Sequence, residues 1–457
     1  MKQIDFKNGG TLSNILSAAL PMLVAQILNL LYNIVDRIYI ARIHGIGTAA
    51  LGAVGLCFPI VIVISAFTNM YGSGGAPLFS IERGRGNDRE AKSYQNTSFF
   101  LLVSSAVVLT VIGELFGKGI LRVFGASNEA LIYAMPYLRI YLIGTIFSMI
   151  ATGMNPFITA GGYAVVGMTT VMVGAVANII LDPIFIFVFD LGVEGAAIAT
   201  VISQALSALY VLKFLYKKDY AYRLHLLNLN EVKRSVKYVY KIVALGTAAF
   251  IVQFTNAVVQ ISCNNVLSTV GGDIYISIMT IVNSARQMME TPILAITEGT
   301  SPLISYNYGA RRYDRIKKAI LIMFVLDLAY TMGVWLFIKL SPETIIGAFS
   351  NDKTIMVDAV AAFNVYFSTF VFMIFQHSGQ VVFKSLGMKY HAIFFSLFRK
   401  VVIVVPLTYI LPYFFKMGTM GVFLAEPISN VVGGLACFTT MLIVINKTFK
   451  EEEKAQL

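Results

Sequence analysis

Long apolar runs separated by short polar connections make up most of the chain. A helix needs about 20 mostly apolar residues to cross the ~30 Å hydrocarbon layer of a bilayer, and twelve runs of that length can be counted. They lie near residues 13–37, 47–71, 94–116, 131–153, 163–189, 194–216, 238–264, 274–298, 317–339, 355–380, 391–415 and 420–446. The pattern predicts an all-α polytopic membrane protein with twelve transmembrane helices.

The first run also has a polar face, within the stretch PMLVAQILNLLYNIVDR (21–37). Five polar residues recur at spacings of three and four, which places them on one arc of a helix. They are Gln26, Asn29, Tyr32, Asn33 and Asp36. A carboxylate at membrane depth costs roughly 2.5–3.5 kcal/mol, so one is expected to face a cavity or a partner. Asp36 is therefore the first candidate functional residue. The alternative is that Asp36 lies at the end of the helix, in the lipid headgroup region beside Arg37.

Composition agrees with a membrane protein. Only 13% of residues are charged, against about 25% in soluble domains, and 57% are hydrophobic. The segment before the first apolar run, residues 1–12, is short and polar, so no cleavable signal peptide is expected. Cys57, Cys263 and Cys437 fall in apolar runs without zinc or disulfide spacing and are expected to be core residues.

The net charge of +11 follows topology. Of the 35 Lys and Arg residues, 24 lie in the termini and the even-numbered connections, and about seven lie in the odd-numbered ones. The positive-inside bias therefore predicts cytoplasmic termini in a multi-pass plasma-membrane protein. It assigns the basic excess to membrane lipid headgroups and argues against nucleic acid as a partner.

The chain repeats itself at an offset of 225 to 227 residues. GAPLFSIERGRGNDREAKS (75–93) aligns with GTSPLISYNYGARRYDRIKKA (299–319), and LGVEGAAIATVISQ (191–204) with MGTMGVFLAEPISN (417–430). Six crossings return each half to its starting side, so the halves share one orientation. The repeat predicts two pseudo-symmetric six-helix bundles, residues 1–222 and 223–457, joined by a basic linker at 217–237.

The repeat duplicates the polar stripe but not its acid. At an offset of 227, Asp36 falls on Cys263, while the three amides of the first stripe fall on amides of the seventh run. This asymmetry favours ion coupling in the first half. The stripes supply candidate substrate-binding residues: Asn29, Asn33, Gln253, Asn256 and Gln260.

The fifth run, ANIILDPIFIFVF (177–189), places Asn178 and Asp182 on one helix face. Pro183 has no N–H to donate to the carbonyl of Ile179, which is left bare one turn before the acid. An acid, an amide and a free carbonyl suit a proton or a small cation; the alternative is an ordinary helix break near the surface. Thr200 in the sixth run could complete the site.

The second half has charged residues of its own. Arg286 and Glu290 are four apart, and mutual neutralisation is the favoured interpretation. Asp327 lies mid-span without a local partner, and Glu290 and Asp327 are candidates for binding a cationic substrate. His377 is interpreted as a packing residue, and Arg399 is expected to snorkel or to bond carbonyls.

Enzyme signatures are missing from the sequence: it contains no GxxxxGK, HExxH or GxSxG motif. Gly72, Gly74 and Gly75 lead into Pro77, where a dinucleotide fingerprint needs glycine or alanine. The chain is therefore expected not to be an enzyme and to need no cofactor other than a coupling ion.

Together these motifs resemble the multidrug and toxic compound extrusion (MATE) family, and most of all its MepA-like branch. The resemblance rests on Pro21 followed by Tyr32 and Asp36, on ANIILDPIF, on LGVEGAAIAT leading into Thr200, and on YNYGARRYDRIKKA. It covers essentially the entire chain.

The resemblance implies a V-shaped pair of six-helix bundles that exports bulky, often cationic, amphiphiles in exchange for H⁺ or Na⁺. It implies an ion-coupling site in the first bundle and bending at Pro21 after protonation. That site comprises Tyr32, Asp36, Asn178, Asp182 and Thr200, and Na⁺ would be held by the last four. The seventh run has no acid, so the sodium site that some relatives build in the second bundle is not expected here.

Asp36 and Asp182 are thus predicted to share a buried site in a monomeric antiporter, and two nearby carboxylates cannot both ionise cheaply. Two other functions compete with this prediction. A flippase of lipid-linked saccharides or lipids would need a strongly cationic cavity. A non-transporting membrane scaffold or receptor would need no paired acids within the membrane.

Overall fold

The computed structural model describes residues 3–44, 46–225, 229–349 and 353–454, and every regular element in these ranges is a helix. The chain forms two compact units. Unit 1 comprises Met1–Asp5 and Leu20–Phe250, and unit 2 comprises Phe6–Ala19 and Ile251–Leu457. The chain changes unit inside two of its helices, and the bundles 1–222 and 223–457 stay a prediction.

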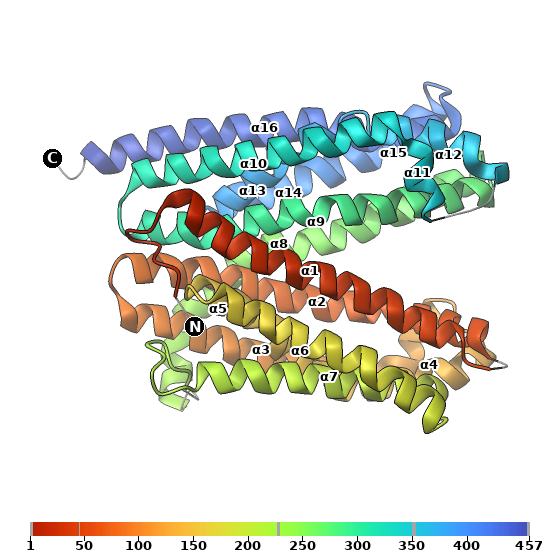
Figure 1. Cartoon of the computed structure of the whole chain (residues 1–457), viewed down its shortest axis with the longest axis horizontal. Coiled ribbons are helices and arrows are strands. Elements are labelled where there is room, and N and C mark those ends of the chain that lie inside the picture. The colour runs from red at the N-terminus through yellow and green to blue at the C-terminus, as the bar shows by residue number, and fades with distance from the viewer. Residues whose placement is uncertain (1–2, 45, 226–228, 350–352, 455–457) are drawn as a thin grey trace. The chain divides into compact units, whose positions relative to one another are not determined.

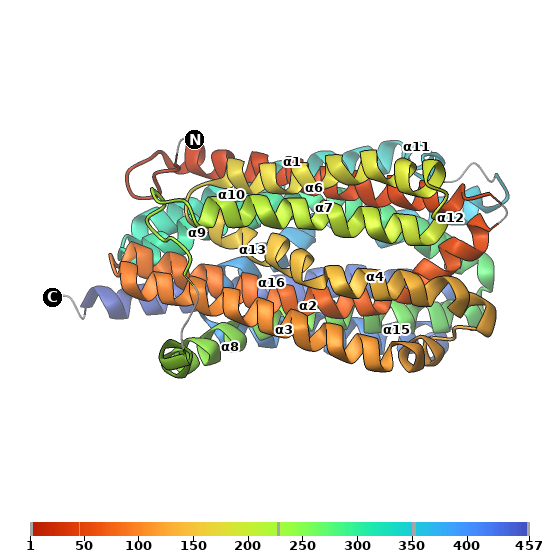
Figure 2. The ribbon, with the colours of Figure 1, turned by 90° about the horizontal axis from the view of Figure 1, so that it is seen from below.

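Long helices lie side by side within each unit (Figures 1 and 2). The first half contains α1 (Thr11–Ala41), α2 (Gly47–Gly84), α3 (Asp88–Val123), α4 (Asn128–Gly153), α5 (Asn155–Ala160), α6 (Ala164–Pro183), the π-helical η1 (Ile184–Val188) and α7 (Gly192–Leu215). The second half contains α8 (Leu229–Val270), α9 (Asp273–Gly309), α10 (Tyr313–Leu340), α11 (Pro342–Gly347), α12 (Lys353–Tyr366), the 3₁₀ turn η2 (Phe370–Phe372), α13 (Met373–Ser385), α14 (Lys389–Leu397), the π-helical η3 (Phe398–Val404), α15 (Val405–Tyr413) and α16 (Gly418–Lys454).

Most of these helices could cross a membrane. Within the described residues, ten segments are long and apolar enough, and the bent pair formed by α12 and α13 makes up to eleven. The remaining predicted crossing, 274–298, lies in α9, a 37-residue helix that carries Arg286, Glu290 and Glu298. The fold class predicted from the sequence, an all-α polytopic membrane protein, is confirmed.

The predicted crossing 355–380 is not one continuous helix. It breaks between Tyr366 and Phe370 and bends by 41°. At the break, the Thr369 hydroxyl donates a hydrogen bond to the carbonyl of Pro427 on α16, over 3.0 Å. Phe367 beside it is buried and meets Phe370 edge to face, with ring centroids 5.7 Å apart. These tertiary contacts compensate for the interrupted helix.

Each unit has its own apolar core. In unit 1, α4 packs on α3 and α7, α2 packs on α3 and α4, and α6 packs on α7. In unit 2, α16 packs on α13 and α15, and α9 packs on α10 and α13. Large apolar side chains that remain exposed, such as Val188 at 73% and Phe254 at 64%, are suited to lipid.

The internal repeat is visible in the backbone. α2 ends at Gly84 and α9 at Gly309, which are aligned positions in the two halves. Gly192 and Gly418, also aligned, begin α7 and α16 with φ of +53° and +57°. Such positive φ angles favour glycine, so both copies keep the same entry into the helix.

Candidate functional site

Asn178 and Asp182 lie on the buried face of α6 in unit 1. Their exposures are 2% and 0%, and the Asn178 amide donates to Oδ1 of Asp182 over 3.1 Å. The same amide lies 3.4 Å from Oγ1 of Thr200 on α7. One amide therefore links the acid of the fifth predicted crossing to the hydroxyl of the sixth.

The second acid comes from α1. The carboxyl groups of Asp36 and Asp182 lie within hydrogen-bonding reach of each other. Tyr32, one turn earlier on α1, is close enough to interact electrostatically with both acids. The structure thus brings together the five residues predicted as an ion-coupling site: Tyr32, Asp36, Asn178, Asp182 and Thr200.

Three oxygens of this group are buried and accept no hydrogen bond from any described residue: Oδ1 of Asp36, Oδ2 of Asp182 and Oδ1 of Asn178. Buried polar atoms normally have partners, so each such atom calls for an explanation. A proton or a small cation bound among them would provide one. Among the described residues, no group of three or more His, Cys, Asp or Glu side chains could hold a metal ion.

Two tyrosines of α4 extend the site, and the sequence reasoning did not identify them. Tyr137 and Tyr141 stack with centroids 6.3 Å apart and are 6% and 7% exposed. Tyr137 is close enough to interact with Asp36, and Tyr141 with Tyr32. The sequence signal that could have identified them is their i, i+4 spacing, which places both rings on one helix face. Aromatic residues are too common in this chain for that spacing to stand out.

Pro183 ends α6 one residue after Asp182, and the chain continues as the π-helical turn η1 rather than as a loop. π-Helical turns occur often at functional sites because they change the direction of side chains. The sequence predicted the missing donor at Pro183 but not this turn.

The amides predicted to bind substrate lie on α1 in unit 1 and on α8 in unit 2. Asn29 and Asn33 are exposed on α1, and the Asn33 amide donates to the carbonyl of Asn29. In α8, Asn256 is exposed and Gln253 is half-buried. Gln260 donates to Asn264 over 2.9 Å and accepts from Asn283 over 2.7 Å.

Unit 2 contains a neutral counterpart of the acid pair. Cys263 aligns with Asp36, and Thr408 aligns with Asp182 at an offset of 226. The sulfur of Cys263 lies 4.0 Å from Oγ1 of Thr408. The two halves therefore bring equivalent positions together, but only unit 1 has carboxylates there.

The charged residues of unit 2 pair in ways the sequence predicted only in part. Arg286 and Glu290 form the expected ion pair, at 3.3 Å. His377, interpreted as a packing residue, lies 2.9 Å from Glu290. Arg399, expected to snorkel or to bond carbonyls, is buried. It donates to Glu426, a residue the sequence reasoning missed, and to the amide oxygen of Asn430.

Asp327 remains isolated in α10. It is 0% exposed, and neither carboxyl oxygen has a hydrogen-bond partner among the described residues. This agrees with the absence of a local partner in the sequence, and its predicted role in binding a cationic substrate stays a prediction.

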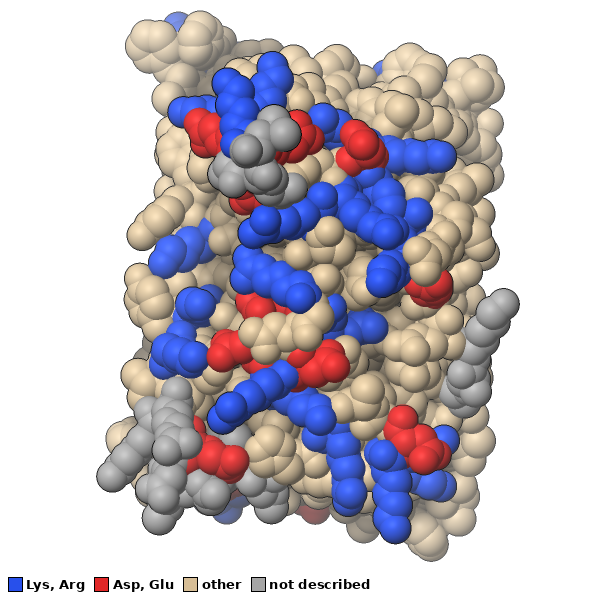
Figure 3. Space-filling model, turned by 90° about the vertical axis from the view of Figure 1, so that its left-hand side faces the viewer, with Lys and Arg blue, Asp and Glu red and all other residues tan. Residues whose placement is uncertain are grey.

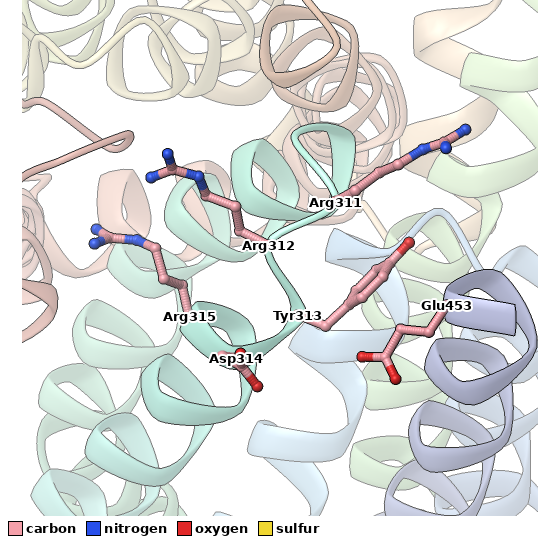
Figure 4. A pocket seen from close by; sticks show the side chains of 6 residues that line it. All are labelled: Arg311, Arg312, Tyr313, Asp314, Arg315 and Glu453. Carbon is pink, nitrogen blue, oxygen red and sulfur yellow. The ribbon is translucent and has the colours of Figure 1, made fainter. Parts of the chain in front are cut away.

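A separate surface cavity of about 410 Å³ lies at the turn between α9 and α10 in unit 2. Its lining, shown in Figure 4, consists of Arg311, Arg312, Tyr313, Asp314, Arg315 and Glu453. Arg312 and Arg315 extend to one side of the turn and Arg311 to the other. Residues predicted for coupling are not part of this lining.

A two-unit helical protein with paired acids inside an apolar bundle has the architecture of a membrane transporter. The family model MatE matches residues 21–184 and 248–410, so the chain belongs to the MatE, or multidrug and toxic compound extrusion, family. The first matched range lies in the first half of the repeat and the second range in the second half.

Named relatives agree with this membership. The chain is 28% identical over 355 residues to the multidrug export protein MepA of Staphylococcus haemolyticus, covering 77% of this chain and 76% of that protein. A MATE crystallised in complex with MaL6 superposes with a TM-score of 0.91 at 24% identity, covering 99% of this chain and 100% of the other. An outward-facing multidrug resistance MATE transporter gives the same TM-score and identity, with 99% of both chains covered.

Proposed function

We propose that this protein is a secondary active multidrug exporter that exchanges bulky, often cationic, amphiphiles for protons by alternating access. The observation that carries the proposal is the approach of the Asp36 and Asp182 carboxyl groups within hydrogen-bonding reach. The names of the relatives as multidrug export proteins support the substrate class.

The chemistry of the pair favours a proton as the coupling ion. Two carboxylates at this separation repel each other when both are ionised, and a shared proton removes the repulsion and forms a hydrogen bond. Asp182 has no contact with solvent, so adding or removing that proton changes the energy of the unit 1 interior. Protonation from outside would thus favour one conformation of unit 1, with bending at Pro21 as the predicted response.

Sodium is the competing ion. Oxygens of Asp36, Asp182, Asn178 and Thr200 would hold it, and the Asn178 amide already turns its N–H groups toward Asp182 and Thr200, leaving its own oxygen without a partner. The transport experiment below distinguishes the two ions.

The decisive experiment measures ethidium export by the purified protein in liposomes, first under an imposed proton gradient and then under an imposed sodium gradient. We expect the proton gradient to drive export in the wild type. Asp36→Asn should abolish gradient-driven export, because an amide cannot give up the shared proton, while leaving expression and folding intact.

Asp219→Asn is the matched control, because Asp219 lies in the connection after α7 with its side chain 85% exposed. It should transport like the wild type. Full gradient-driven export by Asp36→Asn would rule out the coupling role, and export driven only by sodium would replace the proton with Na⁺.

The competing functions give different results in the same assay. A scaffold or receptor would show no substrate-dependent proton movement. A flippase of lipid-linked saccharides or lipids would move no ethidium. We further propose that the protein acts as a monomer in the cytoplasmic membrane, in contact with lipid, with both termini in the cytoplasm.

A further inference from the structure

Six ionisable side chains converge inside unit 2, outside the site described above. They come from four helical segments of the second half. The cluster, called the unit 2 charge cluster below, consists of Arg286 and Glu290 of α9, His377 of α13, Arg399 and Lys400 of η3, and Glu426 of α16.

Glu426 is the centre of the cluster. Its Oε1 lies 3.2 Å from Arg286, 2.9 Å from Arg399 and 2.9 Å from Lys400. Glu290 contacts Arg286 on one oxygen and His377 on the other. Both carboxylates are therefore engaged by cations that the protein itself supplies.

The charges within the cluster do not cancel. Three basic side chains, those of Arg286, Arg399 and Lys400, face only two carboxylates, and the described ion pairs connect the cluster to no further acid. With all three basic side chains protonated, the cluster carries at least one excess positive charge. Uncompensated charge inside a membrane protein is expensive, and it marks a position where a counter-charge is expected.

One side of the cluster is open. The side chains of Arg399, Lys400 and Glu426 are 5–8% exposed, whereas those of Arg286, Glu290 and His377 are 15–18% exposed. The Arg286 guanidinium donates to the Tyr366 hydroxyl over 3.1 Å and pairs with Glu290 and Glu426. Of the three basic side chains, that of Arg286 is the most exposed, at 15%.

The internal repeat relates one member of this cluster to the unit 1 site. Glu426 aligns with Thr200 of the unit 1 site at an offset of 226. None of the described ion pairs involves the two carboxylates of unit 1. In unit 2 the aligned positions are the neutral Cys263 and Thr408, and the basic side chains come from positions with no counterpart in the unit 1 site. The first site suits a cation, and the second suits an anion.

We propose that the unit 2 charge cluster binds the anionic group, a carboxylate, phosphate or sulfonate, of an amphiphilic ligand. Arg286 is the basic side chain nearest the open side, and Lys400 supplies the excess charge. The role of the cluster as a substrate subsite rests on the proposed export function. The test measures binding without coupled transport, so the anion site and the export function can fail separately.

The test uses two dyes that differ in one anionic group: zwitterionic rhodamine B, whose carboxylate is free, and its cationic ethyl ester. Binding to the full-length protein in phosphatidylcholine nanodiscs is measured by fluorescence anisotropy. We expect Lys400→Met to raise the Kd of rhodamine B about tenfold or more, which corresponds to about 1.4 kcal/mol, and to leave the Kd of the ester within twofold.

Two control variants separate charge from folding. Lys400→Arg keeps the charge and should retain the binding of rhodamine B. Lys384→Met removes a lysine that pairs with Glu298 outside the cluster, and it should leave the Kd of both dyes unchanged. The proposal would be overturned if Lys400→Met raised the Kd of both dyes equally or changed neither Kd. It would also be overturned if the wild type bound the two dyes with the same Kd.

Anionic lipid and soluble ligand are distinguished by adding phosphatidylglycerol to the nanodiscs. If phosphatidylglycerol competes with rhodamine B for the wild type but not for Lys400→Met, a lipid headgroup is the source of the anionic group. Unchanged binding of rhodamine B identifies a soluble amphiphile.

Discussion

Asn178 is the residue on which the geometry of the unit 1 site depends. Its amide donates to both Asp182 and Thr200, so it fixes which oxygen of Asp182 stays available to Asp36. The i, i+4 spacing predicted that Asn178 and Asp182 share one helix face. The contact with Thr200 depends on how α6 packs against α7.

Replacing Asn178 with Ala should slow proton-driven ethidium export at least about tenfold. The variant leaves Oδ1 of a fully buried acid without its donor, at a cost of about 1–3 kcal/mol. Asn155→Ala is the matched control, since Asn155 donates to Gly167 and Thr170, neither of which is an acid. Equal loss of coupled export in both variants would show a general packing effect instead.

At the scale of elements, α1 is shared between the units. Residues Phe6–Ala19 belong to unit 2 and the chain from Leu20 belongs to unit 1, so the change falls beside Pro21, the predicted position of bending. The unit 2 portion is held by side chains from the end of α9 and the start of α10. Asn307 donates to the carbonyl of Phe6, and Arg315 donates to the carbonyl of Gly9 over 2.7 Å.

Arg315→Ala should therefore loosen the start of α1. Amide hydrogen exchange in residues 6–19 should become about tenfold faster, because a hydrogen bond to a charged donor contributes about 1.5–3 kcal/mol. Mass spectrometry of peptides from exchanged protein measures this. Arg311→Ala serves as the control, because Arg311 extends from the other side of the same turn (Figure 4) and should leave exchange in that segment unchanged.

At the scale of the whole molecule, charge distribution determines orientation. Lys and Arg side chains crowd the face shown in Figure 3, with fewer Asp and Glu among them. An excess of Lys and Arg in connecting segments is typical of the cytoplasmic side, so we expect these side chains to face the cytoplasm.

Cysteine labelling tests this orientation. With the three native cysteines replaced, all of which are buried, Asp219→Cys should resist a membrane-impermeant maleimide in intact cells. Glu129→Cys, in the connection after the third predicted crossing, should react. The opposite result would place the termini outside.

Local patterns in the sequence determined the helices, the repeat, and the faces that carry Asp36 and Asp182, because helical spacing and apolar length are properties of short segments. Contacts between segments distant in sequence were decided only by the tertiary structure. The break near Thr369 depends on a carbonyl of α16, and the role of Glu426 depends on cations from α9 and η3. The same holds for the approach of Asp36 to Asp182, since no spacing along one helix states which residue of another helix it will meet.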